Sequence, residues 1–430
     1  MMMDGMINRL ELPKAQYHKN IWLQVGSLID GKSSAPVKDA HIVYNAASLI
    51  YAGKDKPASD LLSGQKKPDA HLPSYTLLPG LTDAHAHLFL EGGELGFKER
   101  KAYLQKSSNE LSDLARDRLQ KLIQTGIIAV RDAGDKNGVG LALSKLYKSD
   151  SKPLMPYIDS PGAAIHHKGQ YGTFMSDPIE NYGSLQDVVK FRIRHGVDRI
   201  KIIASGIIDF KTGSVNSKPQ MSVVEIAEIG RVCKETGLQT FAHATGADGI
   251  ENVIAGGVDS VEHGFFIGND QLAKMRDRNI AWVPTFTPVY LQVEHKDIMG
   301  WDDTIVSNLR RILDQHASSL LKAYDLGVKI IAGSDAGSYG AAHGNGLLLE
   351  MEIMEKASMS ALAVINAATG IGAMRLGYKD KFGIIKAGYK SRFMLTKYDP
   401  LNTVSNLRKE KHIVFDDHVY HVNVLDLKGM

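Results

Sequence analysis

The middle of this 430-residue chain alternates short apolar runs with segments of helical periodicity. Each of the eight apolar runs ends in a small or polar residue, and helical patterns separate several of them. Strands that alternate with helices predict a parallel sheet, and eight such units are typical of an α/β (β/α)8 TIM barrel, with a doubly wound open sheet as the alternative. The runs begin at Ser74, Gly126, Met155, Asp198, Leu238, Val258, Ile280 and Val328.

One segment between two of these runs carries both the start and the stop signal of a helix. Ser107 and Ser108 stand where a helix N-cap is expected, and Gly126 stands where the helix would end. Apolar residues recur between them with helical spacing, which predicts an amphipathic helix packed on the sheet. These apolar residues are Leu111, Leu114, Leu119 and Leu122.

Both ends of the chain read as short strands separated by turns. Before residue 75 the strand-like runs begin at Ile21, Ala40 and Ser48, and near the other end they begin at Ser391 and His412. The two ends are therefore expected to meet in one small β-sandwich-like domain, built from residues 1–78 and 376–430. Residues 79–375 would then form the barrel, inserted between the two halves.

The composition indicates an ordinary globular protein. Hydrophobic residues make up 43% of the chain and charged residues 23%. A net charge of +3 is slight for this length and does not predict a nucleic-acid partner. No run approaches the length of a membrane span, so no membrane partner is expected.

The cellular compartment is predicted from the cysteine content and the start of the chain. Cys233 is the only cysteine, which excludes an internal disulfide framework and is typical of a reducing compartment. Met1 to Glu11 contains charged residues and lacks the continuous apolar core of a signal peptide. We therefore expect a cytoplasmic protein. The sequence leaves its oligomeric state open, a homo-oligomer included.

Ionisable residues interrupt five of the predicted strands at the edge where barrel enzymes place their chemistry. Two histidines lie two residues apart in the first strand, so both imidazoles point to one face. Each such residue alone has a structural explanation, such as a hydrogen bond or a cap, but those explanations would have to hold on all five strands. The residues are His85 and His87, Lys201, His243, His263 and Asp335.

Imidazole and carboxylate groups together predict a site for zinc or a similar divalent ion with an open position for water. Asp335 would bind the metal and accept a proton from the bound water, whose pKa the metal lowers. Lys201 is unusual in such a set, because an ammonium with a pKa of about 10.4 repels a cation. Either Lys201 is carboxylated and bridges two metals, or it is no ligand and the site holds one metal.

Taken together, the motifs resemble the amidohydrolase superfamily, in the branch of imidazolonepropionase and the metal-dependent prolidases. The matching stretches follow the family order and cover nearly the whole chain after about Ile21. They are LLPGLTDAHAHL, DRIKIIASG, FAHATGADGIENVIAGGVDSVEHG, PTFTPVY, AGSDAGSYGAAHGNGLLLEM and NAATGIGAMRLGYKDKFGIIKAGYKSRFMLTKYDPL.

The resemblance implies a role for each candidate ligand. His85 and His87 match the pair that binds the more buried metal, and Lys201 matches the carboxylated lysine that bridges two metals. His243 and His263 match the ligands of the second metal, and Asp335 matches the metal-binding general base. The resemblance thus implies two zinc ions per chain and attack of a bridging hydroxide on an amide carbonyl, with His263 and Asp335 as the catalytic residues.

The loop after the predicted third strand, which is expected to face the substrate, differs from the sequence common in the family. Prolidase-like relatives often carry Gly-Gly-His-Gly there, whereas this chain reads GAAIHHKGQYGTFM. A substrate carboxylate could meet Lys168 or a histidine, which would favour amino-acid-like small molecules. The candidate substrate-binding residues are His167, Lys168, Tyr171 and His343.

Three functions are compatible with these residues. The first is hydrolysis of an amide, such as a Xaa-Pro dipeptide or an N-acyl amino acid, at a two-metal site. The second is cyclic-amide opening or deamination at a one-metal site, although the glutamate that deaminases of this family place three residues after the fifth-strand histidine is Gly246 here. The third is a catalytically inactive metal-binding protein, which the intact ligand set disfavours.

Overall fold

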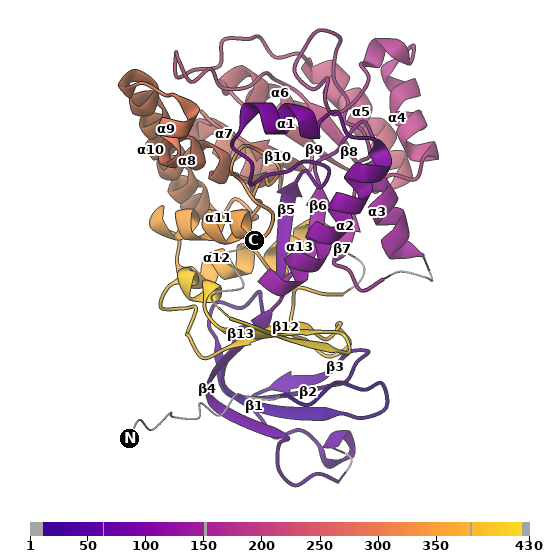
Figure 1. Ribbon diagram of the computed structural model, residues 1–430, viewed down its shortest axis with the longest axis vertical. Helices are drawn as coiled ribbons and strands as arrows, with labels where there is room; N and C mark the ends of the chain where they lie inside the picture. Colours follow the sequence, from indigo (N-terminus) through magenta and orange to yellow (C-terminus); the bar gives the residue numbers. More distant parts are fainter. Residues whose placement is uncertain (1–11, 63, 150–152, 379–380, 424–430) are drawn as a thin grey trace.

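A computed structural model describes residues 12–62, 64–149, 153–378 and 381–423 of the chain. A sheet built from both chain ends lies at one end of the molecule, and parallel strands surrounded by helices lie at the other (Figure 1). The expectation drawn from Met1 to Glu11 concerns residues outside the described ranges. No helix within these ranges is both long enough and apolar enough to cross a membrane.

Seven strands from the two chain ends form one continuous sheet in the order β14-β13-β12-β4-β1-β2-β3. The predicted meeting of the two ends is therefore confirmed, although the strands join in one sheet rather than in two facing ones. Most pairs are antiparallel as expected, but β1 and β4 run parallel. The strands are β1 Ile21–Leu28, β2 Val37–Tyr44, β3 Leu49–Gly53, β4 Ala70–Pro79, β12 Arg392–Thr396, β13 Lys411–Phe415 and β14 His418–Val422.

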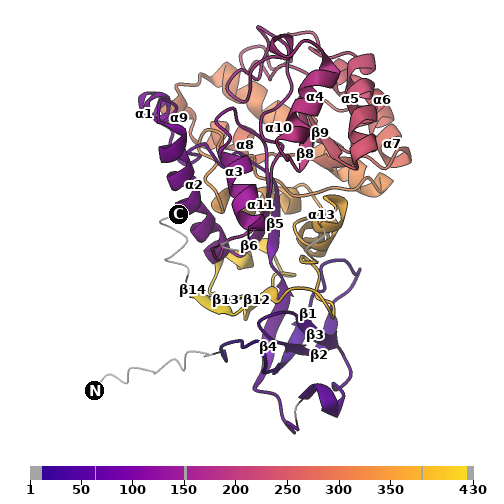
Figure 2. The ribbon, with the colours of Figure 1, turned by 90° about the vertical axis from the view of Figure 1, so that its right-hand side faces the viewer.

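Seven parallel strands form two further sheets in the middle of the chain, of three and four strands. Their order follows the sequence, β5-β6-β7 and β8-β9-β10-β11. Figure 2 shows helices on the outer side of these strands. The strands are β5 Leu81–Ala86, β6 Ile127–Asp132, β7 Tyr157–Asp159, β8 Arg199–Ile203, β9 Gln239–Ala244, β10 Ser260–His263 and β11 Ala281–Val283.

The helices follow the predicted alternation, and the helix Ser108–Thr125 begins and ends where its capping signals predict. Ser107 accepts a hydrogen bond from the Glu110 backbone N–H, and Gly126 ends the helix in the left-handed conformation. The helices are α1 Phe97–Tyr103, α2 Ser108–Thr125, α3 Val139–Lys148, α4 Leu185–Arg194, α5 Val223–Thr236, α6 Ala247–Gly256, α7 Asn269–Asp277, α8 Thr287–Glu294, α9 Lys296–Met299, α10 Asp303–Leu326, α11 Asn345–Lys356, α12 Ala361–Ala367 and α13 Gly370–Arg375, with short 3-10 turns at η1 Ser59–Leu62, η2 Ile179–Asn181 and η3 Val404–Arg408.

The eighth predicted strand, from Val328, is hydrogen-bonded to both neighbours without forming a regular strand. On one side the Ile331 N–H donates to the Trp282 carbonyl in β11, and on the other the Asp335 N–H donates to the His85 carbonyl in β5. Asp335 has φ 49°, in the left-handed region. The Ile165 N–H donates to the Lys201 carbonyl, so the segment after β7 also joins β8.

The core of the seven-stranded sheet joins side chains from the two ends of the sequence. Phe393 in β12 and Tyr44 in β2 pack edge to face with ring centroids 5.0 Å apart, and both are fully buried. Aromatic pairs of this geometry add to the stability that burial provides. The N-terminal strands therefore depend on residues synthesised some 350 positions later.

We predict that Phe393→Ala lowers the free energy of unfolding by about 3–5 kcal/mol, because it leaves a cavity beside Tyr44. Phe393→Leu, which keeps most of the volume, should cost less, about 1–2 kcal/mol. Urea denaturation followed by tryptophan fluorescence measures both values, since Trp22 lies in β1 of the same sheet. A loss below about 1 kcal/mol for Phe393→Ala would show that the N-terminal strands do not rely on β12.

Candidate metal centre and cavity

All six predicted ligands line one cavity of about 960 Å³. They arrive from different strands because the carboxyl ends of parallel strands meet at one edge. Two residues come from β5 and its end, one from the middle of β8, two from the ends of β9 and β10, and one from the segment that follows β11. They are His85, His87, Lys201, His243, His263 and Asp335.

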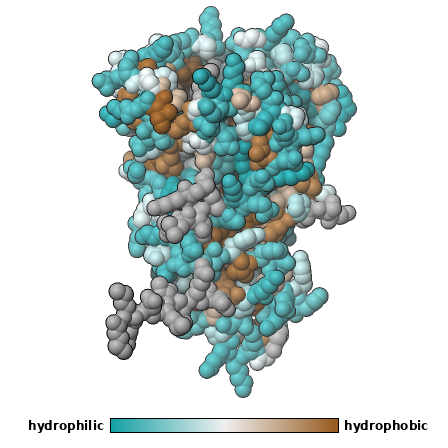
Figure 3. Space-filling model, in the orientation of Figure 1, coloured by the Kyte–Doolittle hydropathy of each residue, from teal (hydrophilic) through white to brown (hydrophobic). Residues whose placement is uncertain are grey.

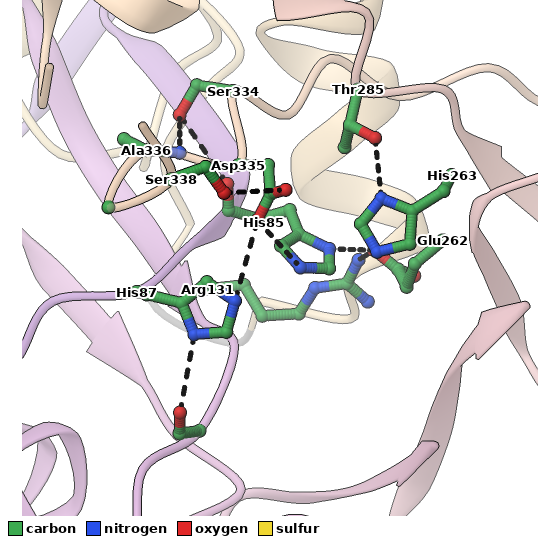
Figure 4. Close-up of polar contacts among 12 residues, drawn as sticks. His85, His87, Arg131, Glu262, His263, Thr285, Ser334, Asp335, Ala336 and Ser338 are labelled. Atoms are coloured by element: carbon green, nitrogen blue, oxygen red, sulfur yellow. Dashed lines mark hydrogen bonds and ion pairs between the residues drawn. The ribbon is translucent and has the colours of Figure 1, made fainter. Parts of the chain in front are cut away.

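Three of these side chains approach one another closely enough to share a metal ion. The Nε2 atoms of His85 and His87 lie 3.5 and 3.4 Å from Oδ1 of Asp335. One ligand atom from each of the three residues lies within 4.8 Å of the others. Figure 4 shows both imidazoles turned toward the Asp335 carboxylate. This group is a candidate metal site.

The rear nitrogens of the histidines are engaged, which fixes which nitrogen faces the site. Nδ1 of His85 donates to the Glu262 carboxylate at 2.6 Å, so its Nε2 lone pair points to Asp335. Nδ1 of His263 lies 2.7 Å from the Thr285 hydroxyl, and Nδ1 of His87 lies 3.4 Å from a backbone carbonyl. Metal-binding histidines usually make such a second hydrogen bond, which sets their tautomer. The donor set therefore fits a metal.

Glu262 is itself held in place by Arg131 from β6. The guanidinium donates to Glu262 at 2.7 Å and to the Ser260 hydroxyl at 3.0 Å, and it lies over the Phe241 ring. Burial alone would raise the pKa of the Glu262 carboxyl, but Arg131 and the hydrogen bond from His85 lower it to about 2. Glu262 is thus a buried anion that orients His85 (Figure 4).

His85, His243 and His263 are neutral at physiological pH. Burial, with the nearby Lys201 charge, lowers the pKa of His85 to about 4. Burial also lowers the pKa of His243 to about 4 and that of His263 well below its usual value. Neutral imidazole is the form that binds metals.

Lys201 lies at the centre of the cluster. Its Nζ is 3.5 Å from Nε2 of His85 and 4.7 Å from the centre of the Phe241 ring. Across the described ranges no carboxylate lies within ion-pairing distance of this amine, which is 1% exposed. Burial lowers the pKa of Lys201 to about 8. An amine this close to neutral is a better nucleophile than an ordinary lysine.

His243 and His263 stand beside this lysine, outside the three-residue group. Their ring centroids are 4.6 Å apart, and the His263 ring centroid is 5.0 Å from that of His85. Nε2 of His243 donates to the Gly206 carbonyl at 2.9 Å, which leaves its Nδ1 as the acceptor. The structure thus gathers all six predicted ligands but brings only three of them within 4.8 Å.

Backbone strain accumulates at the edge of the cavity. His263, Thr285 and Asp335 have φ values of 66°, 52° and 49°, although none is glycine. Side chains rarely adopt this region, and it costs roughly 1–3 kcal/mol per residue where it occurs. Two of the three are candidate ligands and the third holds a ligand ring, so the strain coincides with the site.

Of the four predicted substrate-binding residues, only Tyr171 lines the cavity. Its ring centroid is 5.1 Å from that of His243. His167 instead bonds Glu180 and Glu225, each at 2.9 Å.

The remaining two predicted residues lie outside the cavity for different reasons. Lys168 is exposed on the surface. Nε2 of His343 donates to the His87 carbonyl at 3.1 Å, so this buried histidine supports the backbone of a candidate ligand. The loop GAAIHHKGQYGTFM therefore presents its tyrosine to the cavity and its lysine to solvent.

Several residues that order the site were not among the predicted ones. Ser334 donates to Asp83 through both its backbone N–H and its hydroxyl, which fixes the chain next to Asp335. Glu262 directly precedes His263 in β10, and both side chains are buried. Arg131 offered a signal, since an arginine inside an apolar strand requires a buried acceptor.

We predict that Glu262→Gln lowers zinc affinity by about 10- to 100-fold, because a neutral amide holds the His85 ring less firmly than a carboxylate. Competition with a chromophoric chelator measures the affinity. Glu352→Gln is the matched control, since Glu352 also pairs with an arginine, Arg408, but lies outside the cavity. Equal zinc affinity in the wild type and Glu262→Gln would contradict the orienting role.

Known proteins resemble this chain in sequence and in fold over most of its length. Ochratoxinase of Aspergillus niger is 24% identical over 426 residues, covering 91% of this chain and 84% of that protein. A crystal structure of a Xaa-Pro dipeptidase with bound methionine in the active site is 25% identical, with a TM-score of 0.79 over 94% of this chain and all of that one. The crystal structure of Aspergillus niger ochratoxinase has a TM-score of 0.77 and 20% identity, covering 95% of this chain and 96% of that one.

The sequence pattern described as the Amidohydrolase family matches residues 76–422. This range includes every candidate ligand and the strand β12 that returns to the terminal sheet. The chain therefore belongs to the amidohydrolase family and is a hydrolase that acts on C–N bonds.

Proposed function

We propose that this protein is a metal-dependent amidohydrolase that cleaves the amide bond of a small substrate such as a dipeptide or an N-acyl amino acid. One observation carries the proposal: His85 and His87 direct their Nε2 atoms at the Asp335 carboxylate on the floor of a large cavity. The dipeptidase at 25% identity supports an amide substrate, because its name specifies Xaa-Pro dipeptides.

We also propose that the parallel strands close into a (β/α)8 barrel formed by residues 79–375. The hydrogen bonds from Ile165 to β8 and from residues 329–336 to both β11 and β5 support closure. Residues 1–78 and 376–430 would form the second domain around the seven-stranded sheet. The barrel explains why six ligands from four strands and the final segment reach one cavity.

The donor set suits zinc, which prefers neutral imidazole and carboxylate ligands. His85, His87 and Asp335 would hold one ion, and Lys201, carboxylated on Nζ, would bridge it to a second ion held by His243 and His263. The burial of Lys201 without a carboxylate partner supports this modification, since carboxylation would turn the amine into a ligand. When bound, the metals would polarise the substrate carbonyl and lower the pKa of the attacking water.

The residues of the chain supply the proton transfers. Oδ2 of Asp335 accepts a hydrogen bond from the Ser338 hydroxyl at 3.1 Å and Oδ1 faces the two histidines, so the carboxylate that would act as the base is held in one orientation. It would accept the proton of the attacking water and return it to the leaving amine. Nδ1 of His263 contacts the Thr285 hydroxyl, so Nε2 is the ring nitrogen that remains available to the cluster.

A one-metal cyclic-amide hydrolase or deaminase is the second candidate. The observation that favours it is that only His85, His87 and Asp335, among the described residues, form a group within 4.8 Å. Lys201 would then remain an amine beside His85. The metal content of the purified protein separates the candidates, because two ions per chain require the bridging lysine.

We predict that Asp335→Asn retains its fold and loses hydrolysis by about 10²- to 10⁴-fold, the usual contribution of a general base. Turnover of a Xaa-Pro dipeptide library measures the loss, and elemental analysis checks that metal is still bound. Ser338→Ala is the control, since it removes only the hydrogen bond to Asp335 and should cost less than about tenfold. Near-normal turnover by Asp335→Asn would remove this residue from the base role.

We predict that Lys201→Met binds one metal ion fewer per chain than the wild type. After incubation with carbon-13-labelled bicarbonate, the wild type should show a carbamate resonance that this variant lacks. Lys411→Met is the control, because Lys411 is also 1% exposed but lies in β13, where it donates to the Leu407 carbonyl. Full metal occupancy in Lys201→Met would exclude a bridging role.

A further inference from the structure

The cavity wall combines a broad apolar surface with a single arginine. Its floor carries the candidate ligands, while most other lining side chains are aliphatic or aromatic. Arg100 in α1 is the only arginine among the described residues that line it. A buried guanidinium in apolar surroundings needs acceptors for its donors and a counter-charge.

Arg100 has hydrogen-bond acceptors in the protein but no ion-pair partner among the described residues. It is 9% exposed, and two of its five N–H groups donate to the Glu91 and Gly337 carbonyls. Within the described ranges no carboxylate lies within ion-pairing distance of it, since the neighbouring Glu91 pairs with Arg118. Burial accordingly lowers the pKa of Arg100. Its other three N–H donors have no hydrogen-bond acceptor in the part of the chain that the structure describes.

The segment before α1 holds Arg100 against the loop that carries the candidate base. The guanidinium stacks on the Tyr339 ring at 4.3 Å and donates to Gly337, two residues after Asp335. Gly92 packs so closely here that a Cβ atom would lie 1.9 Å from the Ala341 carbonyl oxygen. The cation is therefore fixed at short range from the reacting centre.

We propose that Arg100 binds the carboxylate of the substrate, and that the preferred substrates join a large apolar acyl group to an amino acid with a free carboxylate. This inference rests on the proposed amide hydrolysis. Water adds to the acyl carbonyl carbon, the C–N bond breaks, and the products are the acyl carboxylic acid and the free amino acid. A carboxylate matches the planar guanidinium and supplies the missing counter-charge.

The apolar part of the cavity wall would bind the acyl group of such a substrate. Near α8 and α9, hydrophobic side chains gather at the upper left of the surface in Figure 3, and these helices contribute to the cavity. Ile207 and Ile298, which are 54% and 65% exposed, also line the cavity. Other apolar lining residues are Leu95, Leu104, Phe174, Phe210, Phe265 and Trp301.

Lys168 was the earlier candidate for this carboxylate. It is exposed on the surface and does not line the cavity, whereas Arg100 does. An exposed ammonium is compensated by water and gains little from a new partner. The buried guanidinium gains more, because its desolvation has already been imposed by folding.

The test compares N-(2-naphthoyl)-L-phenylalanine with its neutral C-terminal amide, on zinc-loaded protein. Release of naphthoic acid gives kcat and KM for each compound, and calorimetry with the two compounds gives binding independently of turnover. Wild type should prefer the acid. Arg100→Gln keeps N–H donors for the backbone carbonyls but removes the charge, and it should raise KM for the acid about 10- to 100-fold with little change for the amide.

Three further variants determine what either result means. Arg100→Lys keeps the charge and should retain part of the preference for the acid, while Arg116→Met, an exposed arginine on α2, should behave as wild type. Equal losses for acid and amide in Arg100→Gln, or a selective loss in Lys168→Ala instead, would overturn the proposal. If neither compound is hydrolysed, the proposed function fails, and acid binding that Arg100→Gln abolishes would still support the carboxylate site.

Discussion

The arrangement of the site depends on one buried ion pair, between Arg131 and Glu262. Arg131 comes from β6 and Glu262 from β10, so the pair spans the interior between two separate sheets. Breaking either partner would leave a buried charge uncompensated, which usually costs several kcal/mol. Its function is positional: Arg131 holds Glu262 as an anion that accepts a hydrogen bond from Nδ1 of His85, and His85 then offers Nε2 to the cavity.

A second set of contacts fixes the opposite side of the site. Asp83, in the same strand as His85, binds Ser334, and Ser334 precedes Asp335. The strand that supplies the first histidines thus also places the carboxylate that faces them. Arg100 contacts the same region, because its guanidinium donates a hydrogen bond to the Gly337 carbonyl in the loop after Asp335. The segment that carries the candidate base Asp335 therefore also positions Arg100, the proposed carboxylate-binding residue.

The candidate ligands could be predicted because each is an ionisable residue that interrupts an apolar strand at its end. The helix from Ser108 to Thr125 could be predicted because Ser107 and Gly126 mark its ends locally. What could not be predicted arises between distant segments. The parallel pairing of β1 with β4 and the contact of Arg131 with Glu262 depend on tertiary packing. The local pattern also does not indicate the left-handed backbone of Asp335, and Arg100 lies in a charged stretch that is typical of a surface helix.

The position of β4 in the terminal sheet has a consequence for synthesis on the ribosome. β4 lies between β1, which precedes it, and β12, which begins more than 300 residues later. Until β12 emerges, one edge of β4 has unpaired N–H and C=O groups, which can pair with a strand from another chain. The nascent N-terminal strands are therefore an aggregation hazard throughout translation of the catalytic region. The hazard ends when β12 pairs with the free edge of β4.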